Sequence, residues 1–164
     1  MDFALSQEIH APLWAVEQAL GDVRYYQTFT SGSSSVQAPE LLDVSTSEHI
    51  LALRVRYAFA GQLSGAARMA VDAEKLTWVI ETHLDLQTHR ARLDVIPDHY
   101  DDLLRCEAEV VFTEHGEHTI ELLEGSLNVS VPFFGGTIEQ AIVEGLKEHV
   151  AMEAAALAGF CSST

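Results

Sequence analysis

Pro132-Phe133-Phe134-Gly135-Gly136-Thr137-Ile138-Glu139-Gln140 introduces the longest helical pattern in the chain, which continues to about Phe160. Proline interrupts a strand, and the paired glycines allow the backbone to turn sharply. Thr137 and Gln140 have the spacing of a capping box, so the pattern predicts a helix from about Thr137 to Phe160. A helix of that length crosses a whole small domain. We therefore interpret it as the element that the rest of the fold must accommodate.

The apolar residues of this predicted helix fall on one side at a spacing of about 100° per residue. That side carries Ile138, Ile142, Gly145, Leu146, His149, Met152, Ala156 and Phe160. The opposite side carries Gln140, Glu144 and Lys147. An amphipathic helix buries its apolar side against another element, and the preceding sequence indicates that this element is a sheet.

Residues 1–35 predict one strand, one or two short helices and a loop. Residues 3–9 alternate apolar and polar side chains with the period of a strand. Pro12 suits the first position of a helix that ends near Gly21, and a second helical or irregular piece covers 22–29. Residues 30–35 are rich in Ser and Gly, which predicts a mobile loop.

Residues 40–131 predict a meander of antiparallel strands, because alternating segments are broken by turn residues about every ten positions. The predicted strands are 42–46, 51–59, 76–86, 89–95, 104–112 and 120–131. In the last strand Ile120 and Leu122 are even-numbered whereas Leu127 and Val129 are odd-numbered, which predicts a bulge at Gly125. Residues 62–75 predict a short helix or a flap over one end of the sheet.

Together these elements predict an α+β fold in a single domain over 1–164: a curved antiparallel sheet of about seven strands, wrapped around the long C-terminal helix. The C-terminal helix is the element left to cover the concave face of the sheet. Gly145, Ala156 and Gly159 add little volume on the covered side. Either the sheet approaches closely there or a hollow remains, and the pattern alone leaves both open.

Composition excludes several classes of function. The formal net charge is −16, from 25 acidic and 9 basic residues, and such a charge repels phosphate backbones and anionic bilayers. We therefore expect no nucleic-acid partner and no stable membrane insertion. The sequence has neither the start of a signal peptide nor a stretch of about 18 apolar residues. Cys106 and Cys161 lack CxxC or zinc-ligand spacing. A soluble, cytoplasmic protein is expected.

Three motifs carry a resemblance to a known superfamily. Residues 124–139 are similar to the final strand and helix start of the START-like, or SRPBCC, superfamily, which includes birch-pollen-allergen-like proteins and polyketide cyclases. More narrowly, residues 75–79, 96–100 and the Pro-x-x-Gly-Gly junction resemble domain-of-unknown-function family 2505. The resemblance covers essentially the whole chain. It implies a helix-grip fold with an internal cavity for lipids, sterols, polyketides or other apolar molecules.

The candidate ligand-binding residues are inward-facing positions of the predicted sheet and helix. They are Tyr57, Phe59, Trp78, Ile80, Leu93, Phe112, Ile142, Leu146, His149 and Met152. A filled core needs such side chains equally. Gln7, Thr82 and His89 are predicted to point inward as well, where each polar group must find a partner. Access for a ligand is expected near 62–75 and 25–35.

His149 and Glu153 form the candidate polar pair, because residues four apart on a helix are neighbours. If Glu153 orients the imidazole, the other ring nitrogen is left for a hydroxyl or carbonyl of a ligand. In an enzyme the same pair would act as acid and base. The simplest alternative is a core histidine that the carboxylate satisfies without any ligand.

No metal and no cofactor is expected. Clusters of acids and histidines at 98–102 and 114–118 fall in predicted hairpin turns and lack a recognised metal-ligand frame. The sequence therefore predicts a carrier or sensor for a hydrophobic small molecule or lipid. Two alternatives stay open: a cyclase- or dehydratase-type enzyme on the same scaffold that uses His149 and Glu153, and a partner-binding domain with a filled core.

Overall fold

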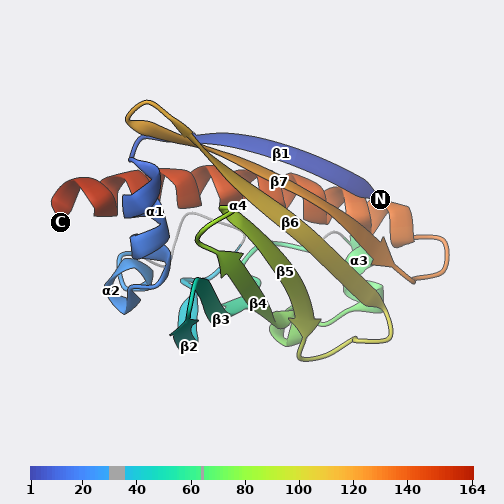
Figure 1. Ribbon diagram of the computed structural model, residues 1–164. Helices are drawn as coiled ribbons and strands as arrows, with labels where there is room; N and C mark the ends of the chain where they lie inside the picture. Colours follow the sequence, from blue (N-terminus) through green and yellow to red (C-terminus); the bar gives the residue numbers. More distant parts are fainter. Residues whose placement is uncertain (30–35, 64) are drawn as a thin grey trace.

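The computed structural model describes residues 1–29, 36–63 and 65–164. One antiparallel sheet of seven strands has the order β1-β7-β6-β5-β4-β3-β2, and the long helix α4 packs on it (Figure 1). The elements are β1 (Asp2–Ile9), α1 (Leu13–Leu20), α2 (Val23–Tyr26), β2 (Glu40–Ser47), β3 (Ile50–Ala58), α3 (Gly65–Ala70), a 3₁₀ turn (Ala73–Lys75), β4 (Thr77–Asp85), β5 (Arg90–Pro97), β6 (Leu104–His115), β7 (His118–Val129) and α4 (Gly135–Ser163). The predicted helix-grip architecture is confirmed.

Most element positions agree with the sequence pattern. The helix expected after Pro12 is α1, and the short piece that follows is α2. The helix expected within 62–75 is α3, and both predicted hairpin turns, 98–102 and 114–118, lie between or at the ends of paired strands. The loop predicted at 30–35 lies outside the described residues. Within the described ranges no helix is long and apolar enough to cross a bilayer.

The start of α4 differs from the prediction. The helix begins at Gly135 rather than Thr137, and its N-cap, Phe134, makes no side-chain capping bond, so the predicted capping box is wrong. The left-handed residue of the turn is Phe133, with φ 65° and a fully exposed side chain. A Cβ atom at Gly135 would collide with the carbonyl oxygen of Val129. Close approach of the chain to the end of β7 therefore requires glycine there.

The predicted bulge at Gly125 is wrong, because β7 pairs without interruption with both β1 and β6 at this residue. A Cβ atom at Gly125 would lie 2.5 Å from Phe3 Cζ and 2.7 Å from the carbonyl oxygen of Glu107, which explains the glycine without a change of register. The odd-numbered residues of β7 face inward throughout. Ile120 and Leu122 consequently lie on the outer face of the sheet. The residue between them, Glu121, lies on the inner face, which α4 covers; we call the space between the sheet and α4 the grip.

The buried face of α4 is rotated from the predicted one. Its buried residues are Val150, Ala154 and Leu157, none of which belongs to the predicted apolar side. The reason is that α4 lies closest to β1 and β7 and packs against α1 and α2, rather than over the middle of the sheet. Predicted inward residues in its first half, such as Ile142 and Leu146, are only partly buried against the core.

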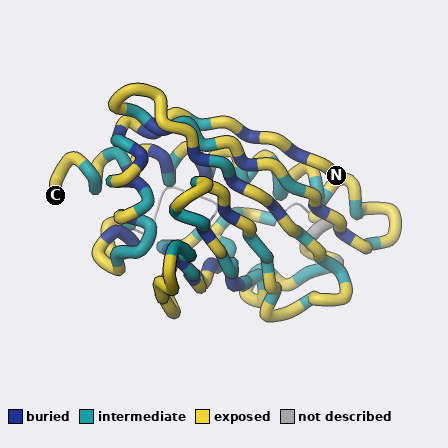
Figure 2. Tube along the Cα trace, in the orientation of Figure 1, coloured by how far each residue is buried: buried dark blue, intermediate teal, exposed yellow. Residues whose placement is uncertain are grey.

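The two ends of the grip differ in how completely they are filled. At the closed end, beneath α1 and α2, Ile9, Val16, Tyr25 and Leu84 have no exposed surface. At the open end, under the first half of α4, several inward side chains keep partial exposure. These are Trp78, Ile80, Leu93, Ile138, Ile142 and Leu146. Figure 2 shows how buried and exposed positions alternate along the long strands.

Candidate ligand-binding site

Polar side chains from four elements converge inside the grip. They are Tyr25 of α2, Tyr57 of β3, Glu121 of β7, and His149 and Glu153 of α4. The ring of His149 meets the ring of Tyr57 edge-on, with 5.5 Å between the centroids. The negative charge of Glu153 acts on the pKa values of Glu121, Tyr25 and Tyr57. We name these five residues the inner polar cluster.

The imidazole of His149 contacts Tyr57 and Glu153, but its hydrogen-bonding capacity is not fully used within the described chain. Its side chain is 13% exposed, and Nε2 lies 3.9 Å from Glu153 Oε2, so the expected helical pair is present at a distance too long for a hydrogen bond. The other ring nitrogen, Nδ1, is buried and has no hydrogen-bond partner among the described residues. A buried polar atom without a partner costs about 1–3 kcal/mol, so this nitrogen favours an occupant that can bond to it.

Tyr25 carries the second unpartnered polar atom. Its hydroxyl is buried without a hydrogen bond in the described part of the chain, and burial raises the pKa of Tyr25 far above its ordinary value. The ring is fixed by edge contacts with Tyr26, Phe29 and Phe160. The neighbouring Tyr26 hydroxyl, by contrast, donates to the carbonyl of Leu20 at 2.7 Å. Within the described chain, the donor capacity of the Tyr25 hydroxyl is therefore unused.

Glu121 is an inward-facing carboxyl on β7, opposite Gln7 of β1 and Phe112 of β6. Burial, followed by the negative charge of Glu153, raises the pKa of Glu121 to about 8. Among the described residues no basic side chain forms an ion pair with it. At neutral pH this carboxyl holds its proton, so it acts as a hydrogen-bond donor as well as an acceptor.

The structure brings several predicted ligand-binding residues to the same side of the sheet. Trp78 stacks on Tyr57 with 5.9 Å between the ring centroids and 12° between the planes, and His149 meets the same tyrosine. Ile80 and Leu93 of the sheet, and Ile142 and Leu146 of α4, are the partly exposed inward residues of the open end. We name these apolar side chains, Trp78, Ile80, Leu93, Ile142 and Leu146, the apolar wall. Tyr57 contacts both Trp78 of this wall and His149 of the inner polar cluster, so the two groups adjoin each other.

The remaining predicted site residues lie apart from that wall. Phe59 follows the end of β3, where it bridges to Val36, and Phe112 is buried at the closed end. Met152 is half-buried on α4. His89, predicted to point inward from a strand, instead lies in the turn before β5 with φ 58°, and its Nδ1 is 2.7 Å from Glu17 Oε1 of α1.

Sequence reasoning missed Glu121 and Tyr25. Glu121 was not predicted because the pattern was interpreted with the even-numbered Ile120 and Leu122 facing inward, which places Glu121 on the outer face. The signal that reveals it is the parity of Leu123, Leu127 and Val129, all odd-numbered and all buried. Tyr25 has no comparable signal, because a helix as short as α2 shows no periodicity.

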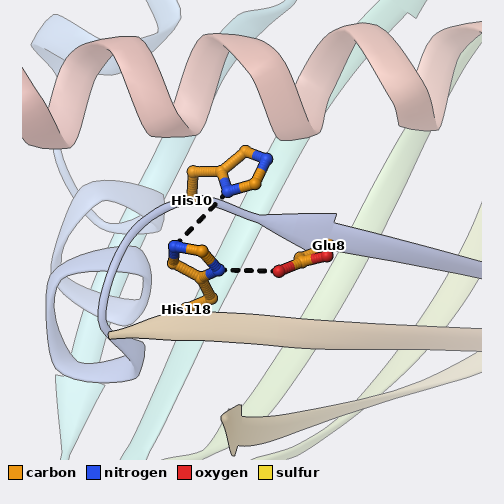
Figure 3. A group of neighbouring side chains, drawn as sticks. All are labelled: Glu8, His10 and His118. Carbon is orange, nitrogen blue, oxygen red and sulfur yellow. Dashed lines mark hydrogen bonds and ion pairs between the residues drawn. The ribbon is translucent and has the colours of Figure 1, made fainter. Parts of the chain in front are cut away.

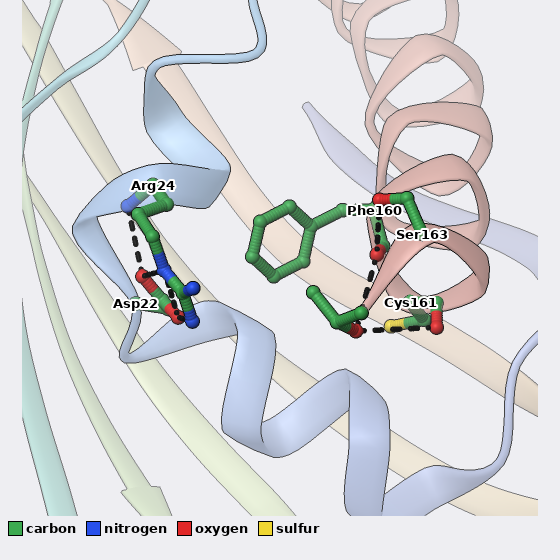
Figure 4. Close-up of polar contacts among 6 residues, drawn as sticks. Asp22, Arg24, Phe160, Cys161 and Ser163 are labelled. Atoms are coloured by element: carbon green, nitrogen blue, oxygen red, sulfur yellow. Dashed lines mark hydrogen bonds and ion pairs between the residues drawn. The ribbon is translucent and has the colours of Figure 1, made fainter.

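Two hollows lie outside the space between the sheet and α4. The first, of about 260 Å³, lies between α1 and the end of α4, where Arg24 donates hydrogen bonds to both carboxylate oxygens of Asp22 (Figure 4). The second, of about 470 Å³, is an open depression formed by residues of β5, β6 and β7. None of the predicted ligand-binding residues lines either hollow. The Asp22 carboxylate neutralises Arg24, so the first hollow offers little to an anion.

Comparison with solved structures shows the same fold in distant proteins. The protein TTHA0849 from Thermus thermophilus is 19% identical, with a TM-score of 0.68 over 99% of this chain and 98% of that one. The Zhui aromatase/cyclase from Streptomyces sp. R1128 is 13% identical, with a TM-score of 0.66 over 99% and 93%. Norcoclaurine synthase from Thalictrum flavum is 14% identical, with a TM-score of 0.61 over 100% and 87%.

These TM-scores establish a shared helix-grip fold, and identities this low establish no shared activity. No curated protein matches the sequence. A family model described as "Protein of unknown function (DUF2505)" matches residues 4–160, which is nearly the whole chain. The chain belongs to the DUF2505 family.

Proposed function

We propose that this protein binds an apolar small molecule between the sheet and the first half of α4, as a carrier or sensor. One observation carries the proposal: within the described chain, His149 Nδ1 and the Tyr25 hydroxyl are buried without a hydrogen-bond partner, and partly exposed apolar side chains lie on the same inner side. Removing apolar ligand surface from water contributes roughly 25 cal/mol per Å². The inner polar cluster then sets the orientation of the ligand.

The charges of the inner polar cluster favour a neutral ligand over an anionic one. Glu153 is an acid, Glu121 holds its proton at neutral pH, and within the described chain neither faces a lysine or arginine partner. An anionic head group such as a fatty-acid carboxylate would be buried near Glu153 without a fixed cation, which is costly. We therefore expect a neutral ligand that carries a hydroxyl or carbonyl group, as sterols and polyketides do.

A matched pair of fluorescent probes tests this proposal. N-phenyl-1-naphthylamine is neutral, and 8-anilinonaphthalene-1-sulfonate adds a sulfonate to nearly the same rings. We expect the neutral probe to bind with micromolar affinity and the sulfonate to bind at least tenfold more weakly. Leu93→Trp should fill the open end and abolish binding of the neutral probe. Leu122→Trp, on the outer face, is the matched control and should leave it unchanged.

Two outcomes would overturn the proposal. Neither probe binding to the wild-type protein would indicate a filled interior, and equal loss in both tryptophan variants would place the probe elsewhere. Native mass spectrometry of protein purified from its own host adds an independent measurement. An adduct of a few hundred daltons that disappears in Leu93→Trp supports the carrier, and its persistence in that variant contradicts the assigned site.

Proton-transfer catalysis on the bound molecule is the second candidate function. The observation that favours it is that the pKa of Glu121, about 8, lies near neutral pH in the same cluster as His149 and Glu153. The aromatase/cyclase and the norcoclaurine synthase show that this fold can host enzymes. His149→Gln distinguishes the two functions, since an enzyme loses turnover while retaining ligand affinity, whereas a carrier changes only in affinity.

A further inference from the structure

Three side chains on the outer face of the sheet form a group with no part in the proposed binding function. Glu8 and His10 come from the end of β1, and His118 is the first residue of β7 (Figure 3). Their ligand atoms all lie within 4.8 Å of one another. From the sequence, residues 114–118 could be considered as a metal site only by themselves, because these partners lie more than 100 positions earlier in the chain.

The hydrogen bond between Glu8 and His118 fixes how the imidazole is protonated. His118 Nδ1 lies 2.6 Å from Glu8 Oε1. An ionised carboxylate only accepts hydrogen bonds, so Nδ1 must carry the proton. Donation from His118 is also the main reason that the pKa of Glu8 lies below its ordinary value. In the neutral ring the lone pair is then on Nε2, which faces His10.

The two imidazoles face each other at a distance that suits a shared cation. His10 Nδ1 and His118 Nε2 are 3.5 Å apart, which is long for a hydrogen bond. Two histidine nitrogens bound to one tetrahedral zinc ion, each about 2.0–2.1 Å from it, are separated by about 3.4 Å. A carboxylate bonded to the far nitrogen of a metal-binding histidine is the usual orienting partner in such sites. Glu8 occupies that place.

From this geometry we infer a site for a divalent transition-metal ion such as Zn²⁺, with His10 Nδ1 and His118 Nε2 as ligands, Glu8 as the orienting carboxylate and water completing the shell. Imidazole ligands suit zinc, copper and nickel rather than magnesium or calcium. All three residues lie at the surface, so the site needs no rearrangement of the core. A bound ion would cross-link the end of β1 to the tip of the β6–β7 hairpin.

Calorimetric titration of the tag-free full chain with Zn²⁺ tests the inference. We expect one ion per chain with micromolar affinity, weakened at least tenfold by His10→Gln and by His118→Gln. Glu8→Gln should weaken binding by about tenfold, since loss of an orienting carboxylate typically costs 10–100-fold. His49→Gln is the matched control, because His49 is another surface histidine beside an acid, with Nε2 3.7 Å from Asp85 Oδ2, and belongs to no metal-ligand group among the described residues.

Proton NMR of the wild-type protein keeps the test valid if a variant folds poorly. Addition of Zn²⁺ should shift the ring resonances of His10 and His118 while those of His49 stay in place. Absence of binding to the wild-type protein, or affinity within twofold of wild type in both histidine variants, would overturn the inference. Either result would leave the group as two neighbouring surface imidazoles that bind no metal ion.

Discussion

The two ends of the grip are built from the same sheet and the same helix, yet one is closed and the other is open. At the closed end Leu84 and Ile9 have no exposed surface, because α1, α2 and the second half of α4 all pack over the sheet there. At the open end, under the first half of α4, Trp78 and Leu93 stay partly exposed. The difference separates the tightly packed part of the core from the apolar side chains that we propose as ligand contacts.

The largest expected effect compares one leucine from each end. Leu84→Ala removes a fully buried side chain from the closed end and should lower the free energy of unfolding by about 3 kcal/mol. Leu93→Ala, at the open end, should lower it by about 1 kcal/mol or less, since that side chain is already partly exposed. Urea denaturation measures both. Equal losses would mean that the two ends are packed alike and would remove the basis of the comparison.

A smaller effect concerns Glu121 of the inner polar cluster. The folded protein holds the Glu121 proton up to about pH 8, whereas the unfolded chain releases it near its ordinary pKa of 4.5. Stability contributed by this group is therefore fully present below about pH 4.5 and is lost as the pH rises through about 8. Glu121→Gln should raise the free energy of unfolding by about 2–3 kcal/mol at pH 8 and by much less at pH 5.

Thermal or urea denaturation at both pH values measures this effect. Glu124→Gln is the matched control, because Glu124 lies on the exposed face of the same strand, and it should show no such difference between the two pH values. A Glu121→Gln variant whose stability changes equally at pH 5 and pH 8 would show that the carboxyl is not protonated in the folded protein.

The smallest effect compares two adjacent tyrosines. Tyr25→Phe deletes a buried hydroxyl that has no partner among the described residues, so the ligand-free protein should become more stable by about 1 kcal/mol. Tyr26→Phe deletes a hydroxyl that donates to Leu20 and should cost about 1 kcal/mol. Denaturation curves of the two variants give the comparison. Destabilisation by Tyr25→Phe would indicate that its hydroxyl is already satisfied, and would weaken its assignment to a ligand.

The sequence predicted the architecture because the main periodicities are strong. Alternation defined the meander from β2 to β7, and Pro12 and Gly21 bounded α1. The buried face of α4 was not predictable in the same way. Val150 and Leu157 are buried because α4 lies beside β1 and β7, and a helical pattern cannot reveal which strands a helix will approach.

The candidate sites were less predictable than the fold. His149 and Glu153 are neighbours on one helix, so their pairing follows from local geometry. Glu121 depends on the parity of β7, which a glycine at 125 obscured: that residue is small because Phe3 covers it, not because the strand bulges. His10 and His118 meet only through the pairing of β1 with β7, at a sequence separation of 108.

The uneven support of α4 has a mechanical consequence. Its second half is anchored by Val150, Ala154 and Leu157, while its first half rests on side chains that are only partly covered. Gly145 lies between the two halves, and no described atom of another segment lies within 4 Å of where its Cβ would be. Near the start of the helix Glu139 accepts a hydrogen bond from the Val129 amide and forms an ion pair with the N-terminal ammonium, so α4 is held at both ends. We therefore expect that a bulky ligand would be admitted by a shift of the stretch around Gly145 rather than by release of either end.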